Sequence, residues 1–160
     1  MTRTTTVDPT TATAATSKTN SLLALALRPV PRSVSPAVRA GTVAGIVFGA
    51  AMVAASAAIH LHLWRIGYRD IPKIGTAFLF QWVSGFVLAA VLLGYRRLVV
   101  VAAGLAFCAG SVVALLLSAT VGFLGLHDGL DVPWAGWSLA SESAGAVVLA
   151  ICAGIMLRRR

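Results

Sequence analysis

Long apolar stretches and short polar connections alternate along most of the chain. Four apolar runs lie at about residues 40–63, 75–94, 98–124 and 133–157, and every Lys and Arg lies outside them. A helix rises about 1.5 Å per residue, so about 20 residues cross a hydrocarbon core of about 30 Å. Each run reaches this length. The pattern therefore predicts an all-α, polytopic membrane protein whose four transmembrane helices form an antiparallel bundle.

The first 37 residues do not share this pattern. Residues 1–20 are rich in Thr and Ala, residues 21–27 are apolar but too short to span, and residues 28–32 read Arg-Pro-Val-Pro-Arg. A segment with little apolar surface to bury stays unfolded, and a basic linker can rest on anionic lipid headgroups. We expect a disordered, basic cytoplasmic tail and linker over residues 1–37, followed by a transmembrane domain over residues 38–160.

Composition and charge fit the same assignment. The chain is 58% hydrophobic and 11% charged, with a mean hydropathy of +0.88, which leaves too little polar surface for a soluble globule of its size. The basic residues on one side of the predicted bundle are Arg28, Arg32, Arg39, Arg96, Arg97, Arg158, Arg159 and Arg160. The opposite side carries Arg65, Arg69 and Lys73, together with Asp70, Asp128 and Asp131.

This distribution of Lys and Arg predicts the orientation. Basic residues gather on the cytoplasmic side of membrane proteins, so both termini are expected in the cytoplasm and the chain in the cytoplasmic membrane. The net charge of +8 is then explained by the basic residues that set the orientation of the chain in the membrane. The lipid bilayer is the expected partner, and a nucleic-acid partner is not expected.

Small residues recur at helical spacing in the first and third runs. They are Gly41, Gly45 and Gly49 at intervals of four, and Gly104, Ser111 and Ser118 at intervals of seven. Small side chains on one face let two helix backbones approach closely. We predict that these residues mediate helix packing, whereas the second run shows no comparable face. The glycine ridge of the first run could also contact a membrane-protein partner or a second copy of the chain.

Glu142 is the only acidic residue inside the four runs. A carboxylate costs several kcal/mol to hold in hydrocarbon without compensation, so an intramembrane acid is a functional candidate. Counting inward from the helix ends places polar groups of the other three helices at similar depth in the outer half of the membrane. The predicted ligand or proton site comprises Glu142, His60, Gln81, Ser56 and Ser118. Interhelical hydrogen bonding alone, worth about 0.6 kcal/mol each, is the structural alternative.

Metal, cofactor and catalytic sites are not predicted. The side chains of His60 and His62 point to nearly opposite sides of a helix, so they do not grip one metal. A site combining His60, Glu142, His127 and Asp128 is chemically reasonable for zinc or copper, but its ligand spacing matches no known pattern. A haem would lack a second intramembrane histidine from another helix. Nothing in the sequence resembles a nucleotide-binding loop or a hydrolase elbow.

One stretch of the sequence carries a resemblance. The segments His60-Leu61-His62-Leu63-Trp64, Gly67-Tyr68-Arg69-Asp70-Ile71-Pro72-Lys73-Ile74-Gly75 and Phe78-Leu79-Phe80-Gln81 follow one another closely. This pattern resembles small four-helix membrane proteins of actinobacterial type, a group without an established activity. The resemblance covers most of residues 40–157. It implies the fold and a membrane location only.

Two functional hypotheses follow. The first is a non-enzymatic integral membrane protein, an accessory or interaction subunit whose outward-facing polar cluster binds a partner, a lipid headgroup or a small ligand. In its headgroup version, Arg65, Arg69 and Lys73 hold anionic lipid, although such residues often only anchor a helix at the interface. The alternative is a small transporter or proton-coupled carrier that uses Glu142.

Overall fold

A computed structural model describes residues 19–31, 34–127 and 129–158. The helices along these ranges are α2 (Pro36–Ile66), the short 3-10 helix η1 (Tyr68–Asp70), α3 (Ile74–Gly94), α4 (Leu98–Thr120) and α5 (Ala135–Leu157). Residues 19–26 form a further short helix, and the described residues contain no β-strand. The predicted all-α class is therefore confirmed for this part of the chain. Residues 1–18 of the predicted disordered tail lie outside the described residues.

The four long helices are each long and apolar enough to cross a membrane. Their outer faces expose large apolar side chains, among them Phe80 at 71%, Val87 at 59% and Ile151 at 58%. Apolar surface of this extent is costly in water but is the ordinary surface of a helix in hydrocarbon. The structure thus supports a multi-pass membrane protein, as the sequence predicts.

The first long helix starts earlier than predicted. α2 begins at Pro36, about one turn before the predicted start near residue 40. Ser35 caps the helix, because its Oγ accepts a hydrogen bond from Val38 N at 3.3 Å. Proline suits the first helical position, where its missing N–H would have no partner. The helix therefore begins before the predicted apolar run, at the proline that follows its cap.

The third long helix ends earlier than predicted. α4 stops at Thr120 instead of near residue 124. Gly122 and Gly125 adopt positive φ angles of 84° and 89°, which L side chains rarely adopt and which no α-helix can contain. Between them the chain reverses, and Phe123 and Leu126 exchange backbone hydrogen bonds of 2.7 and 2.9 Å. The apolar run thus continues into a tight turn.

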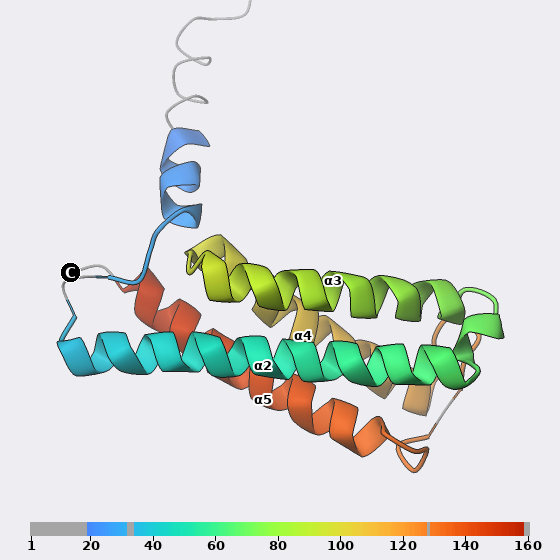
Figure 1. Cartoon of the computed structure of the whole chain (residues 1–160). Helices are drawn as coiled ribbons and strands as arrows, with labels where there is room; N and C mark the ends of the chain where they lie inside the picture. Colours follow the sequence, from blue (N-terminus) through green and yellow to red (C-terminus); the bar gives the residue numbers. More distant parts are fainter. Residues whose placement is uncertain (1–18, 32–33, 128, 159–160) are drawn as a thin grey trace, which may run out of the picture.

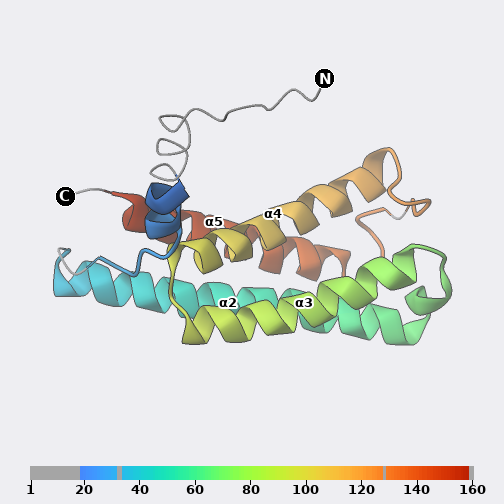
Figure 2. The same ribbon diagram turned by 90° about the horizontal axis from the view of Figure 1, so that it is seen from above.

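The long helices lie side by side, and their connections divide between two ends (Figure 1). The α2–α3 and α4–α5 connections lie at one end, called here the loop end. The α3–α4 turn lies at the other, the terminal end, with the start of α2 and the end of α5 (Figure 1). α3 packs along α2, α2 along α5, and α5 along α4, whereas α3 and α4 contact each other far less (Figure 2). We call this sparsely packed boundary between α3 and α4 the α3–α4 seam.

Leu149 of α5 lies at the centre of the packing. Its side chain is fully buried between Gly49 of α2 and Gly104 of α4. A Cβ atom at these glycines would come within 2.5 and 2.9 Å of the Leu149 side chain, so only glycine permits the observed approach. Gly45 faces α5 in the same way, whereas a Cβ at Gly41 would meet nothing within 4 Å. The close contact of the glycine ridge with α5 therefore begins at Gly45.

α3 also has a small-residue face, contrary to the prediction from its sequence. Gly85 and Ala89 are buried and four residues apart. A Cβ atom at Gly85 would lie 2.8 Å from the Cβ of Ala57 in α2 and 2.9 Å from the ring of Phe107 in α4. Since an alanine methyl group cannot rotate away, Gly85 sets how closely α3 approaches α2.

The segment before α2 is tied to the terminal end. Leu98 N donates to Arg28 O at 2.9 Å, and Arg97 Nη1 donates to Leu27 O at 3.0 Å. Arg28 Nη1 donates in turn to the Met156 carbonyl oxygen at 3.4 Å. The last carbonyls of a helix lack partners within the helix, and a cationic donor is favourable there. The linker therefore joins the α3–α4 turn to the end of α5.

Gly85→Ala should lower the free energy of unfolding by about 1–3 kcal/mol, because its methyl group enters space that Ala57 fills and a helix must move. Gly94→Ala is the matched control in the same helix, since its added carbon meets nothing within 4 Å. The control should stay within about 0.5 kcal/mol of the wild type. Unfolding by SDS in mixed micelles, followed by circular dichroism, measures both. Equal unfolding curves for the two variants would contradict this account of the α2–α3 contact.

Candidate functional site

One oxygen atom of Glu142 accepts hydrogen bonds from three helices. Glu142 lies about two turns from the start of α5, and its side chain is fully buried. Its Oε1 accepts from Ser56 Oγ of α2 at 2.7 Å, from Ser111 Oγ of α4 at 2.8 Å and from Ser138 Oγ of α5 at 2.9 Å. We call these four residues the Glu142 cluster. Ser138 joins it because residues four apart share a helix face.

The fourth helix joins the cluster through an intermediate. Gln81 of α3 donates from Nε2 to Ser111 Oγ at 2.9 Å, so it reaches Glu142 through the serine. All four long helices therefore supply a polar side chain to one network. Interhelical hydrogen bonds of this kind hold helices together where water is absent.

His60 extends the network toward the loop end. Its Nδ1 lies 2.9 Å from the Ser56 carbonyl oxygen and 3.5 Å from Ser56 Oγ. A carbonyl oxygen can only accept, so Nδ1 carries a proton in this arrangement. The Nδ1 proton therefore points at the Ser56 carbonyl oxygen, and His60 lies next to the serine whose hydroxyl donates to Glu142.

The second oxygen of Glu142 has a different environment. Oε2 is buried, and it has no hydrogen-bond partner among the described residues. Leaving a buried polar atom unpaired costs about 1–3 kcal/mol, so such atoms are rare in folded proteins. Oε2 is therefore the atom of this site best able to accept a proton, a cation or the donor group of a ligand.

Glu142 also lines a cavity at the loop end. The cavity has a volume of about 370 Å³. It is lined by the end of α2, η1, the first part of α3, much of α4, the α4–α5 connection and the start of α5. His60, Gln81, Ser111 and Ser138 contribute polar atoms to its wall. The aromatic residues lining it are Tyr68, Phe78, Phe80, Phe107, Phe123 and Trp134. A largely apolar cavity with a few convergent polar groups is the usual form of a small-molecule site.

Ser118 and Ser111 lie at different depths from those predicted. Ser118 was predicted beside Glu142, but its hydroxyl donates to the Leu126 carbonyl oxygen at 3.5 Å, and it lines the cavity nearer the loop end. Ser111, predicted only as a packing residue, contacts Glu142 instead. Since α4 ends at Thr120, Ser118 lies only about 3 Å from the helix end and Ser111 about 14 Å. Glu142 lies about 10 Å from the start of α5. Counting from the true end of α4, the serine closest to that depth is Ser111 and not Ser118.

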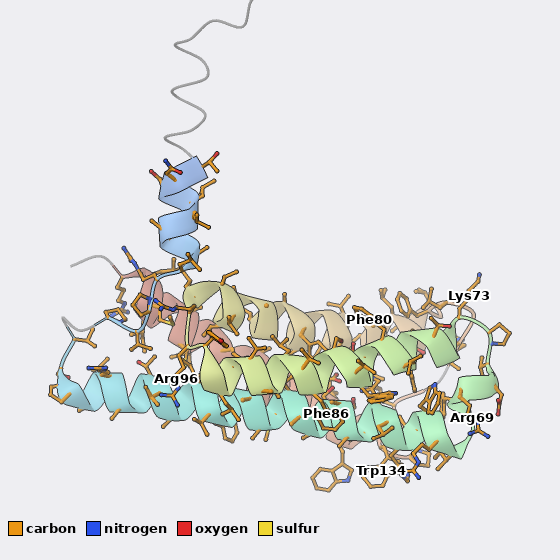
Figure 3. All side chains as sticks on the ribbon, turned by 45° about the horizontal axis from the view of Figure 1, so that its top comes forward. Arg69, Lys73, Phe80, Phe86, Arg96 and Trp134 are labelled. Atoms are coloured by element: carbon orange, nitrogen blue, oxygen red, sulfur yellow. The ribbon has the colours of Figure 1, made fainter. Side chains whose placement is uncertain are left out.

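The three basic residues of the α2–α3 connection lie outside the cavity. Arg65, Arg69 and Lys73 are exposed, and none of them lines it. Figure 3 shows Arg69 and Lys73 at the loop end and Arg96 at the terminal end. Arg69 Nε lies 3.6 Å from a carboxylate oxygen of Asp70, and both side chains are largely exposed. This pair adds little stability, because exposed ion pairs contribute about 0–1 kcal/mol.

Metal-ligand side chains do not gather in the part of the chain that the structure describes. No three His, Cys, Asp or Glu side chains lie close enough there to hold one ion. Asp128, considered as a ligand together with His127, lies outside the described residues. Cys108 and Cys152 are buried free thiols on different helices.

Comparisons with known proteins give no family for this chain. No family model matches it, and no match is found among curated proteins or among solved structures.

Proposed function

We propose that this chain is a non-enzymatic integral protein of the cytoplasmic membrane that holds a small molecule in the cavity at the loop end. In this proposal the four long helices form an antiparallel transmembrane bundle with both termini in the cytoplasm, so the cavity lies in the outer half of the membrane. The observation that carries it is the fully buried Glu142, which lines a cavity of about 370 Å³ and whose Oε2 lacks a hydrogen-bond partner among the described residues.

The hydrogen bonds around Glu142 support a binding role over a catalytic one. The three serine hydroxyls all donate to one carboxyl oxygen. Each is thereby oriented toward Glu142, and together they hold its side chain in one position. A fixed acceptor in an apolar cavity orients a bound molecule and gives specificity.

An accessory role in a larger membrane complex fits the outer surface. Gly41 is exposed on α2, and a Cβ atom added to it would meet none of the described residues within 4 Å. The start of the glycine ridge thus remains available for close contact with a helix of a partner protein or of a second copy. We propose that the chain associates through this surface while the cavity holds its ligand.

A proton-coupled carrier is the second candidate function. It is favoured by a chain of contacts, in which His60 Nδ1 lies 3.5 Å from Ser56 Oγ and Ser56 Oγ donates to Glu142 Oε1 at 2.7 Å. Such a chain links a buried carboxyl group to an imidazole, and both side chains can exchange protons. In this proposal Glu142 binds and releases a proton as the carried molecule moves.

Filling the cavity tests the leading proposal. Ala114→Trp adds a large side chain to the cavity wall, whereas Val113→Trp is its matched control on the exposed face of α4. Small molecules retained by the two purified variants and the wild type would be extracted and identified by mass spectrometry. We expect a molecule retained by the wild type and by Val113→Trp to be largely lost from Ala114→Trp. Equal retention by all three folded proteins would contradict binding in this cavity.

Cysteine labelling tests the orientation. The native thiols are buried, so the wild type provides the background for a membrane-impermeant maleimide. Asp131→Cys introduces an exposed thiol at the loop end, and Arg96→Cys introduces one at the terminal end. In intact cells we expect labelling of Asp131→Cys alone, with Arg96→Cys labelled only after lysis. The reverse result would place the termini outside.

Proton flux separates the two candidate functions. In proteoliposomes with an imposed pH gradient and a pH-sensitive dye inside, the binding proposal predicts no flux above that of empty vesicles. A carrier would give flux that Glu142→Gln abolishes. Ser84→Ala is the matched control, because the Ser84 hydroxyl bonds to backbone carbonyls of its own helix. Protein-dependent flux that disappears only in Glu142→Gln would favour the carrier.

A further inference from the structure

We infer, building on the proposed function, that the molecule held in the cavity is an organic cation with an apolar body, whose ammonium group donates to Oε2 of Glu142. The inference assigns the cavity a class of ligand. It rests on the charge of the lining, the aromatic side chains around it and the route by which a ligand reaches it.

The described residues that line the cavity include one acidic residue, Glu142, and no Lys or Arg. Three hydroxyls already donate to its Oε1, so Oε2 is the acceptor that remains. A neutral hydroxyl can donate to Oε2, but an ammonium group adds opposite charge, and charge-assisted hydrogen bonds are about twice as strong. The low dielectric of the membrane interior strengthens the attraction further.

Aromatic rings in the cavity wall also favour the binding of an organic cation. Tyr68 and Phe78 stack with their ring centroids 5.1 Å apart, and His60 meets Phe78 edge-on at 5.0 Å. All three side chains line the cavity, as do Phe107 and Phe123. The faces of aromatic rings attract cations within about 6 Å. The same rings offer an apolar surface for the body of the ligand, so one lining serves both parts of an amphiphilic cation.

The α3–α4 seam provides a route from the membrane. Phe80 lines the cavity and is also 71% exposed on the outer side of α3, so the cavity reaches the outer surface of the helices (Figure 3). An amphiphilic amine gathers at the membrane interface, near the depth of the loop end. The basic side chains of Arg69 and Lys73 do not line the cavity, so they do not occupy the position of the ligand. A volume of about 370 Å³ suits a small ligand, since such sites span about 300–1,000 Å³.

A matched pair of ligands tests the inference. The first is a diphenylalkyl tertiary amine, which is protonated at pH 7, and the second is its neutral isostere with carbon in place of nitrogen. Binding is measured by calorimetry to the full-length protein in nanodiscs of zwitterionic lipid, with empty nanodiscs as the background. We expect the wild type to bind the amine at least about tenfold more tightly than the isostere, the effect of one hydrogen bond to a charged group.

Three variants test which residues cause the preference for the amine over the isostere. Glu142→Gln keeps the shape of the side chain and should remove the preference for the amine while the isostere still binds. Phe78→Leu should weaken binding of the amine by about threefold and leave the isostere nearly unchanged, through the loss of one cation–π contact. Ser84→Ala, outside the cluster, should keep the full preference.

The outcomes separate this inference from the proposed function. Equal binding of both ligands by the wild type would overturn the cation inference and leave the binding proposal intact. Binding of neither ligand would overturn the cation inference, and the proposed function would then depend on the retention experiment with Ala114→Trp. Because the wild-type comparison needs no variant, the inference stays testable even if Glu142→Gln fails to fold.

Discussion

A carboxyl group buried among apolar helices must find hydrogen-bond donors, and the arrangement of the helices at the loop end depends on this requirement. Glu142 obtains three donors at one oxygen, from Ser56, Ser111 and Ser138. Because Ser111 also accepts from Gln81, no helix can slide by a turn without breaking a bond to this network. The network around Glu142 thereby links the positions of all four helices along their axes.

α2 and α4 both pack tightly against α5, whereas the α3–α4 seam is sparsely packed. Leu149 fills the space between Gly49 and Gly104, so α2 and α4 both lie close against α5. Gly85 brings α3 close to α2 on the other side. The four helices therefore pack in the order α3, α2, α5, α4, and the two outer helices of this row meet sparsely. The cavity lies where they diverge, so the contacts that stabilise the fold also determine where the cavity forms.

The helices, Glu142 and its partner Ser56 could be predicted from the sequence, whereas its partner Ser111 could not. Run length and the absence of Lys and Arg predict four helices, and the membrane cost of an acid singles out Glu142. The depth of each serine depends on where its helix ends. Gly122 ends α4 inside a continuous apolar run, so hydropathy alone matched Ser118 with Glu142 in place of Ser111. The cavity depends on how α3 and α4 diverge, which no spacing along the chain encodes.

The two ends of the molecule differ in a way that bears on binding and transport. At the terminal end the core is closed, since Leu92, Leu149 and Met156 are fully buried and Arg28 bonds across to the end of α5. The cavity is confined to the loop-end half of the helices. A carrier must open its site to both sides of the membrane in turn. Here that would require separating Leu92 and Leu149 from Gly104, where a Cβ atom would lie within 3.1 Å of either side chain. Packing of this kind resists gradual deformation, which supports the proposed binding role over the proposed carrier.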